Sequence, residues 1–100
     1  MEKYIKDGKV GVIISPGYGT GFYTGGAPLE AVFSPSLITM IENRDLHGVS
    51  RVLQEKYNFY LMYKHDLDVK WIPQGSRFKI NEYDGSESIE ILNEQKWLIA

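Results

Sequence analysis

The spacing of hydrophobic residues predicts a strand near the start of the chain, a helical middle and a β-rich second half. Residues 9–14 form a short apolar run with four β-branched side chains, and the dipeptide Asp7-Gly8 before it is a turn signal. We therefore expect a buried strand over residues 9–14. Ser15-Pro16 ends this strand and begins a long loop that extends to Pro28. Long loops in small domains are often functional.

Two helices are expected in the middle of the chain. Ser34 is a suitable N-cap, and Pro35 suits the first helical position. The apolar residues that follow have the spacing of one helical face, and residues 43–45 are expected to end this helix. A second helix is predicted over 46–57, with its apolar positions at Leu46, Val49, Leu53 and Tyr57.

The second half of the chain alternates hydrophobic and polar residues, a pattern typical of strands with one buried face. Asp84-Gly85 is a strong hairpin signal, and residues 73–76 predict another turn. The predicted fold is a single α+β domain over residues 1–100, with a small antiparallel sheet of four to five strands and two helices on one face. The strands of this half are expected at 59–63, 67–72, 78–81, 89–92 and 97–99.

Composition narrows the function classes. One hundred residues with 43% hydrophobic content suit one domain with one core. The net charge of −2 and the scattered basic residues argue against a duplex nucleic-acid binder and a polybasic membrane surface. The absence of cysteine excludes disulfides, thiol nucleophiles and zinc–thiolate sites. No apolar stretch has the length of a membrane span or a signal peptide, so we expect a soluble cytoplasmic protein.

The glycine-rich segment after the first predicted strand is the most informative motif. Backbone N–H groups in such a loop can surround phosphate oxygens, hydroxyl groups can add donors, and aromatic rings can stack on a base. The segment lacks the Lys-Ser/Thr pair of a P-loop and a G-x-G-x-x-G that opens a helix. A turn that packs its aromatic residues into the core, or against another copy, therefore stays open. The predicted ligand-binding residues, including two cations of the second half, are Ser15, Gly17, Tyr18, Gly19, Thr20, Gly21, Phe22, Tyr23, Arg77 and Lys79.

Other candidate chemistry is sparse. His65 lies beside Asp66 and Asp68, but strand alternation would put the histidine on the opposite face from both carboxylates. His47 lies near a predicted helix start, and the sparse ligands favour two ordinary, solvent-facing histidines. The acidic turn over residues 82–90 could supply an acid and a base or hold a divalent cation, but the pattern favours a solvated hairpin tip, because charges at turns are common. We predict no catalytic residue, no metal site and no cofactor.

Several segments together resemble a family of small bacteriophage proteins of unassigned function. Members of that family carry an SPGFGAGW-like loop and an EYDG turn. In this chain Tyr18, Thr20 and Phe22 stand at the aromatic, small and tryptophan positions of that loop. The resemblance covers most of the chain and implies a phage origin and the cytoplasm of an infected bacterium. The segments that carry it are 12–24, 33–35, 53–57, 71–75 and 78–85.

Three functions are compatible with these features. The first is a non-enzymatic homo-oligomeric module that sequesters a small nucleotide-derived signalling molecule and so counters host defence, an analogy of setting rather than of site. The second is an inhibitor of a host protein, which would act through loop aromatics or the acidic face, since interfaces enrich aromatic residues. The third is a small nucleotide hydrolase that uses Glu82, Asp84 or a histidine.

Overall fold

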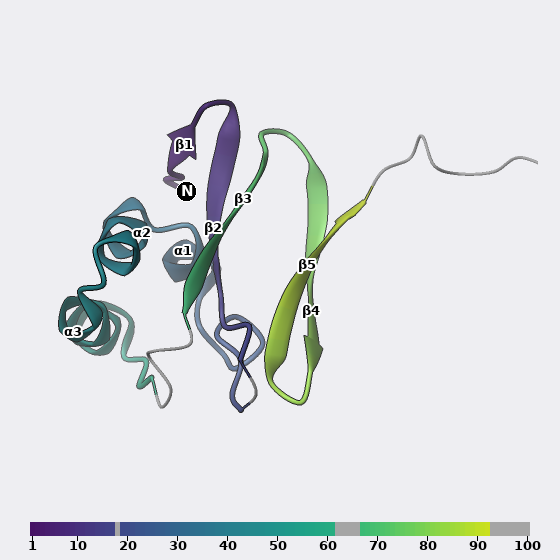
Figure 1. Cartoon of the computed structure of the whole chain (residues 1–100). Coiled ribbons are helices and arrows are strands. Elements are labelled where there is room, and N and C mark those ends of the chain that lie inside the picture. Colours follow the sequence, from purple (N-terminus) through teal and green to yellow (C-terminus); the bar gives the residue numbers. More distant parts are fainter. Residues whose placement is uncertain (18, 62–66, 93–100) are drawn as a thin grey trace, which may run out of the picture.

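The computed structural model describes residues 1–17, 19–61 and 67–92, which form three helices and two antiparallel sheets (Figure 1). The predicted α+β class is confirmed, whereas the prediction of one sheet with four to five strands is wrong. One sheet has the order β1-β2-β3, and the other is a two-stranded hairpin. The strands of the two sheets are β1 (Ile5–Lys6), β2 (Lys9–Ile14), β3 (Asp68–Pro73), β4 (Arg77–Tyr83) and β5 (Ser86–Leu92).

Two-residue turns close both hairpins. Asp7 and Gly8 have φ values of 53° and 74°, and Asp84 and Gly85 have φ values of 51° and 82°. Positive φ at both central residues is the type I′ geometry, whose twist matches that of the flanking strands. Both turn signals in the sequence are thereby confirmed. The strand β1 was not predicted, because two residues are too few to show an alternating pattern.

The three helices are α1 (Leu29–Val32), α2 (Pro35–Glu42) and α3 (Leu46–Tyr57). Ser34 is the N-cap of α2, as predicted, and its Oγ accepts the N–H of Leu37 at 3.3 Å. Asp45 caps α3 in the same way by accepting the N–H of Gly48 at 3.0 Å. The short helix α1 was not predicted. Helices α2 and α3 lie on one side of the three-stranded sheet, and the β4–β5 hairpin lies on the other side (Figure 1).

The core forms around β2. Val10, Val12, Ile13 and Ile14 are all buried, because the helices and the hairpin cover opposite faces of this strand. A strand covered on both faces has a continuous apolar run instead of alternation. Gly11 lets α2 approach closely, since a Cβ there would lie 2.9 Å from Cδ1 of Ile38.

The predicted edge strand over 59–63 is wrong for its described residues, 59–61, which are not in a strand. Asn58 ends α3 in the left-handed conformation, and the N–H of Phe59 then donates to the C=O of Leu53 at 3.0 Å. The Phe59 ring packs edge-on against Phe22, with ring centroids 5.6 Å apart. Phe59 and Leu61 therefore pack against the core instead of forming a strand. Residues 62–63 and the predicted strand at 97–99 lie outside the described residues, as do His65 and Asp66.

Candidate functional site

The glycine-rich loop packs against the tip of the β4–β5 hairpin. The N–H of Gly19 donates to the C=O of Asp84 at 3.0 Å. The Oγ of Ser86 donates to the C=O of Pro16 at 2.6 Å. We call this contact the loop–hairpin junction and define it by Ser15, Gly19, Gly21, Thr24, Gly85 and Glu87. It joins segments about seventy residues apart in the sequence.

The side chain of Glu87 lies at the centre of the loop–hairpin junction and is 2% exposed. Its Oε1 accepts the N–H of Ser15 at 2.8 Å. Its Oε2 accepts the N–H of Thr24 at 2.9 Å and the hydroxyl of Thr24 at 2.8 Å. A buried carboxylate requires such donors, and hydrogen bonds to ionised groups are stronger than neutral ones. The loop therefore surrounds an acidic group, and this group belongs to the protein itself.

Two glycines make this close packing possible. A Cβ on Gly21 would collide with Oγ1 of Thr24 and lie 3.0 Å from Oε2 of Glu87. A Cβ on Gly85 would collide with the C=O of Gly19, and Gly85 also has a φ of 82°. Glycine tolerates positive φ and permits close backbone approach. These glycines therefore serve the contact between loop and hairpin.

The predicted loop residues fall into a buried and an exposed set. Ser15, Gly21 and Phe22 are buried, and Phe22 is a core residue with no exposed surface. Gly19, Thr20 and Tyr23 are exposed, Gly17 is half-buried, and Tyr18 lies outside the described residues. Among the described loop residues, the exposed set and the half-buried Gly17 have surface that a ligand could contact.

The structure does not bring Arg77 and Lys79 to the loop. Glu87 pairs with Glu82 across the hairpin, and alternation along β4 puts Arg77 and Lys79 on the opposite face. Along the strand they lie about 24 and 17 Å from Asp84 at the tip, at about 3.4 Å per residue. Nζ of Lys79 forms an ion pair with Oε2 of Glu90 at 3.1 Å. The hydrogen bond from Lys79, with a second from Asn81, lowers the pKa of Glu90.

Carboxylates of the acidic turn accept hydrogen bonds from backbone N–H groups of the turn and of the loop. Oε1 of Glu82 accepts the N–H of Gly85, which stabilises the turn. Glu87 is used in the loop–hairpin junction. Within the described residues no group of three His, Asp, Glu or Cys side chains gathers as a metal site.

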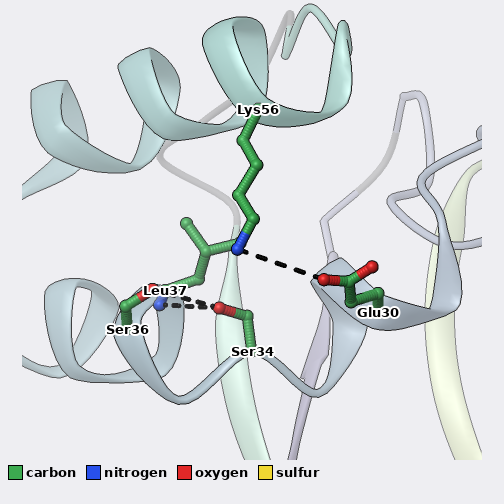
Figure 2. Close-up of polar contacts among 5 residues, drawn as sticks. All are labelled: Glu30, Ser34, Ser36, Leu37 and Lys56. Carbon is green, nitrogen blue, oxygen red and sulfur yellow. Dashed lines mark hydrogen bonds and ion pairs between the residues drawn. The ribbon is translucent and has the colours of Figure 1, made fainter. Parts of the chain in front are cut away.

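A pocket of about 340 Å³ lies at the start of α2, and none of its lining residues is among the predicted ligand-binding residues. Three elements contribute to it, since Glu30 comes from α1, Lys56 from α3 and Ser34 from the α2 N-cap (Figure 2). Nζ of Lys56 lies 4.0 Å from Oε1 of Glu30, and Oγ of Ser34 lies 3.2 Å from Oγ of Ser36. We call this the α2 pocket. Its lining residues are Met1, Glu2, Glu30, Ser34, Pro35, Ser36, Lys56 and Tyr57.

The α2 pocket combines donors with an acidic wall. Pro35 has no N–H, and the N–H of Leu37 is used by Ser34, so Ser36 supplies the first-turn N–H without an intrahelical acceptor. The helix start also carries the positive end of the helix dipole. Nζ of Lys56 lies 5.4 Å from the centre of the Tyr57 ring. The ion pair between Lys56 and Glu30 is weak, because both side chains are more than 60% exposed. The capping signal Ser34-Pro35-Ser36 was visible in the sequence, but the approach of Lys56 from α3 was not.

Comparisons with known proteins leave the family open. No family model matches the chain, and searches of curated proteins and of solved structures find no match. The resemblance to small bacteriophage proteins therefore stays a prediction. Within residues 1–17, 19–61 and 67–92, no helix combines the length and the apolar character needed to cross a membrane.

Proposed function

We propose that the protein is a non-enzymatic binding module for a small phosphate-bearing ligand and that the ligand binds in the α2 pocket. The observation that carries this proposal is the convergence of Lys56, the hydroxyls of Ser34 and Ser36 and the start of α2 on one concavity of about 340 Å³. Small-molecule sites are concave, have volumes of about 300–1,000 Å³ and contain a few convergent polar groups. A helix start with a nearby cation favours an anion.

The acidic wall of the α2 pocket restricts the ligand class. Glu2 and Glu30 line the same pocket as Lys56 and would repel a polyphosphate. The same carboxylates can accept hydrogen bonds from sugar hydroxyls, and Tyr57 in the pocket lining is a residue type on which a base stacks. A ligand with one phosphate group, such as a nucleoside monophosphate or a cyclic nucleotide, suits this combination best.

The loop–hairpin junction supports the α2 pocket over the glycine-rich loop as the ligand site. Glu87 already occupies the donors of Ser15 and Thr24, and the N–H of Gly19 is used by Asp84. A phosphate that used the N–H groups of Ser15 and Thr24 would have to displace a buried carboxylate. The sequence resemblance implies a phage origin and the cytoplasm of an infected bacterium, and sequestration of a nucleotide signal by a homo-oligomer is our proposal by analogy with that setting.

Calorimetric titration with adenosine monophosphate, cyclic adenosine monophosphate and inorganic phosphate tests the proposal. The matched variants are Lys56→Met in the α2 pocket and Lys79→Met on the hairpin. We expect Lys56→Met to weaken nucleotide binding about tenfold or more, since hydrogen bonds to charged groups contribute about 1.5–3 kcal/mol. Lys79→Met should bind like the unmodified chain. Equal affinities in both variants, or no binding of any of the three probes, would contradict the proposal.

A further inference from the structure

We propose that the free edge of β5 binds an extended segment of a partner protein, in the groove between β3 and β5. This interaction surface is separate from the α2 pocket, and it goes beyond the binding of a small ligand. The groove is about 480 Å³ and is lined by residues of both strands (the β3–β5 groove). In Figure 1, β5 lies between the viewer and β4 and runs beside the sheet that ends in β3.

The register of the β4–β5 hairpin identifies the backbone groups of the free edge. The two-residue turn makes Tyr83 and Ser86 the first hydrogen-bonded pair. The pattern then alternates, so that Ser88 and Glu90 direct their N–H and C=O groups toward β4. Ile89 and Ile91 direct theirs away from β4, and no partner for them is recorded among the described residues. Unpaired edge groups of this kind are a template for another strand.

The chain itself already uses the beginning of this edge. Glu87 is the first edge-facing residue of β5, and its N–H donates to the C=O of Ser15 at 2.8 Å. Ser15 directly follows β2, so the first position of the β5 edge is already paired with backbone of the same chain. From Ser15 the chain continues along the hairpin toward its tip, where Oγ of Ser86 donates to the C=O of Pro16, so it runs away from the next two edge positions, Ile89 and Ile91. A further strand would continue a pairing that the fold has begun.

The opposite wall of the groove is also a strand edge. The N–H of Gln74 donates to the C=O of Gly8 at 2.9 Å, which makes Gly8 and Gln74 a hydrogen-bonded pair. By alternation Ile72 and Lys70 bond to β2, and Trp71 directs its backbone groups away from it. Trp71 also lines the groove, so the outer strand of the three-stranded sheet borders it opposite β5.

The side chains of the groove define the chemistry of the segment. Ile14, Ile72 and Ile89 give the groove an apolar floor, and Ile91 at its open end is 46% exposed. Lys70 is half-exposed at the rim, and its contact with Asp68 at 3.5 Å is a weak surface pair. A segment with apolar residues at alternate positions and an acidic residue opposite Lys70 complements this surface in both shape and charge.

Selection from a displayed library of random peptides on the full chain tests the proposal. We expect the selected peptides to alternate apolar and polar residues with at least one acidic position. Bound peptide should slow amide hydrogen exchange of Ile89 and Ile91 about tenfold or more, while the β4-facing amides of Ser88 and Glu90 should change little. Ile91→Pro removes one edge-facing N–H and keeps the β4 pairing, since proline is tolerated at a strand edge. It should weaken peptide binding about tenfold, and Ile91→Ala, which keeps the N–H, should weaken it less.

Three results would overturn the proposal: no selected peptide, a peptide that binds elsewhere, or a second copy of the chain at this edge. A library without binders, or binders that leave the exchange of Ile89 and Ile91 unchanged, would exclude peptide pairing at this edge. If the protein without peptide forms a dimer that protects the same two amides, the occupant is a second copy instead of a partner. Should Ile91→Pro fail to fold, the exchange measurement on the unmodified chain still decides. Lys56→Met, which tests the proposed small-ligand function, should leave peptide binding unchanged.

Discussion

Ser15 and Glu87 hold each other through two reciprocal hydrogen bonds. The N–H of Glu87 donates to the C=O of Ser15 at 2.8 Å, and the N–H of Ser15 donates to Oε1 of the Glu87 side chain at 2.8 Å. One residue of β5 thus binds the backbone of the glycine-rich loop through both its main chain and its side chain. This relationship anchors the start of the loop to the hairpin, and it is the reason that we propose the α2 pocket instead of the loop as the ligand site.

Glu87→Gln should lower the free energy of unfolding by about 2 kcal/mol, because it leaves a buried donor without its acceptor. The glutamine amide group would face the N–H of either Ser15 or Thr24, and two donors cannot pair. The control is Glu90→Gln, since Glu90 is exposed and its change should stay within about 0.5 kcal/mol. Urea denaturation measures both variants. Equal midpoints would show that Glu87 does not stabilise the junction.

Gly85→Ala and Gly75→Ala separate the contact at the junction from backbone strain. The two glycines have similar φ values of 82° and 84°, so alanine strains the backbone at both positions. A Cβ at Gly75 meets nothing within 4 Å, whereas at Gly85 it collides with Gly19. We expect Gly85→Ala to destabilise the protein by about 1–3 kcal/mol more than Gly75→Ala, the range for forced overpacking. If thermal unfolding showed the same decrease in melting temperature for both variants, the close contact between Gly85 and Gly19 would be excluded.

Phe22→Ala should lower the stability of the fold rather than remove a ligand contact. Phe22 has no exposed surface, so its truncation to alanine should lower the free energy of unfolding by about 3–5 kcal/mol. Tyr23, its neighbour, is 42% exposed, and Tyr23→Ala should cost about 0.5 kcal/mol or less. Chemical denaturation distinguishes the two. A Phe22→Ala variant as stable as Tyr23→Ala would contradict the core position of Phe22.

Lys79→Met should raise the pKa of Glu90 toward the ordinary glutamate value. Hydrogen bonds from Lys79 and Asn81 lower this pKa in the folded state, and the first is lost in the variant. A depressed carboxyl pKa stabilises the fold above the unfolded pKa, and this contribution is lost as pH falls through the folded pKa. The contribution is small because both side chains are at least half exposed. Carboxyl NMR titration measures the shift, and an unchanged pKa would mean that the ion pair does not form in solution.

Local signals in the sequence account for much of the fold. Asp7-Gly8 and Asp84-Gly85 predicted their turns, because few residues other than glycine adopt the conformations that these turns require. Ser34-Pro35 predicted the start of α2 through capping chemistry. Residues 59–61 were mistaken for a strand, because an apolar run does not distinguish sheet pairing from core packing against Phe22.

The candidate site depended on contacts that one sequence cannot reveal. Glycines in the loop predicted close approach, but nothing in the sequence indicated that Glu87 would approach from so far along the chain. The α2 pocket likewise depends on the packing of α3 beside α2, which brings Lys56 to the first turn of another helix. Such long-range packing follows from the whole core rather than from any one motif.

Backbone NMR with adenosine monophosphate as the titrated ligand tests the central claim most directly. If the α2 pocket is the ligand site, the amide of Ser36 and the neighbouring amides of Leu37 and Lys56 should shift on binding. The amide chemical shifts of Ser15 and Thr24 should stay unchanged, because the Glu87 carboxylate already accepts hydrogen bonds from both N–H groups. Shifts confined to Ser15, Gly19 and Thr24, with Ser36 unchanged, would contradict the account and return the ligand to the glycine-rich loop.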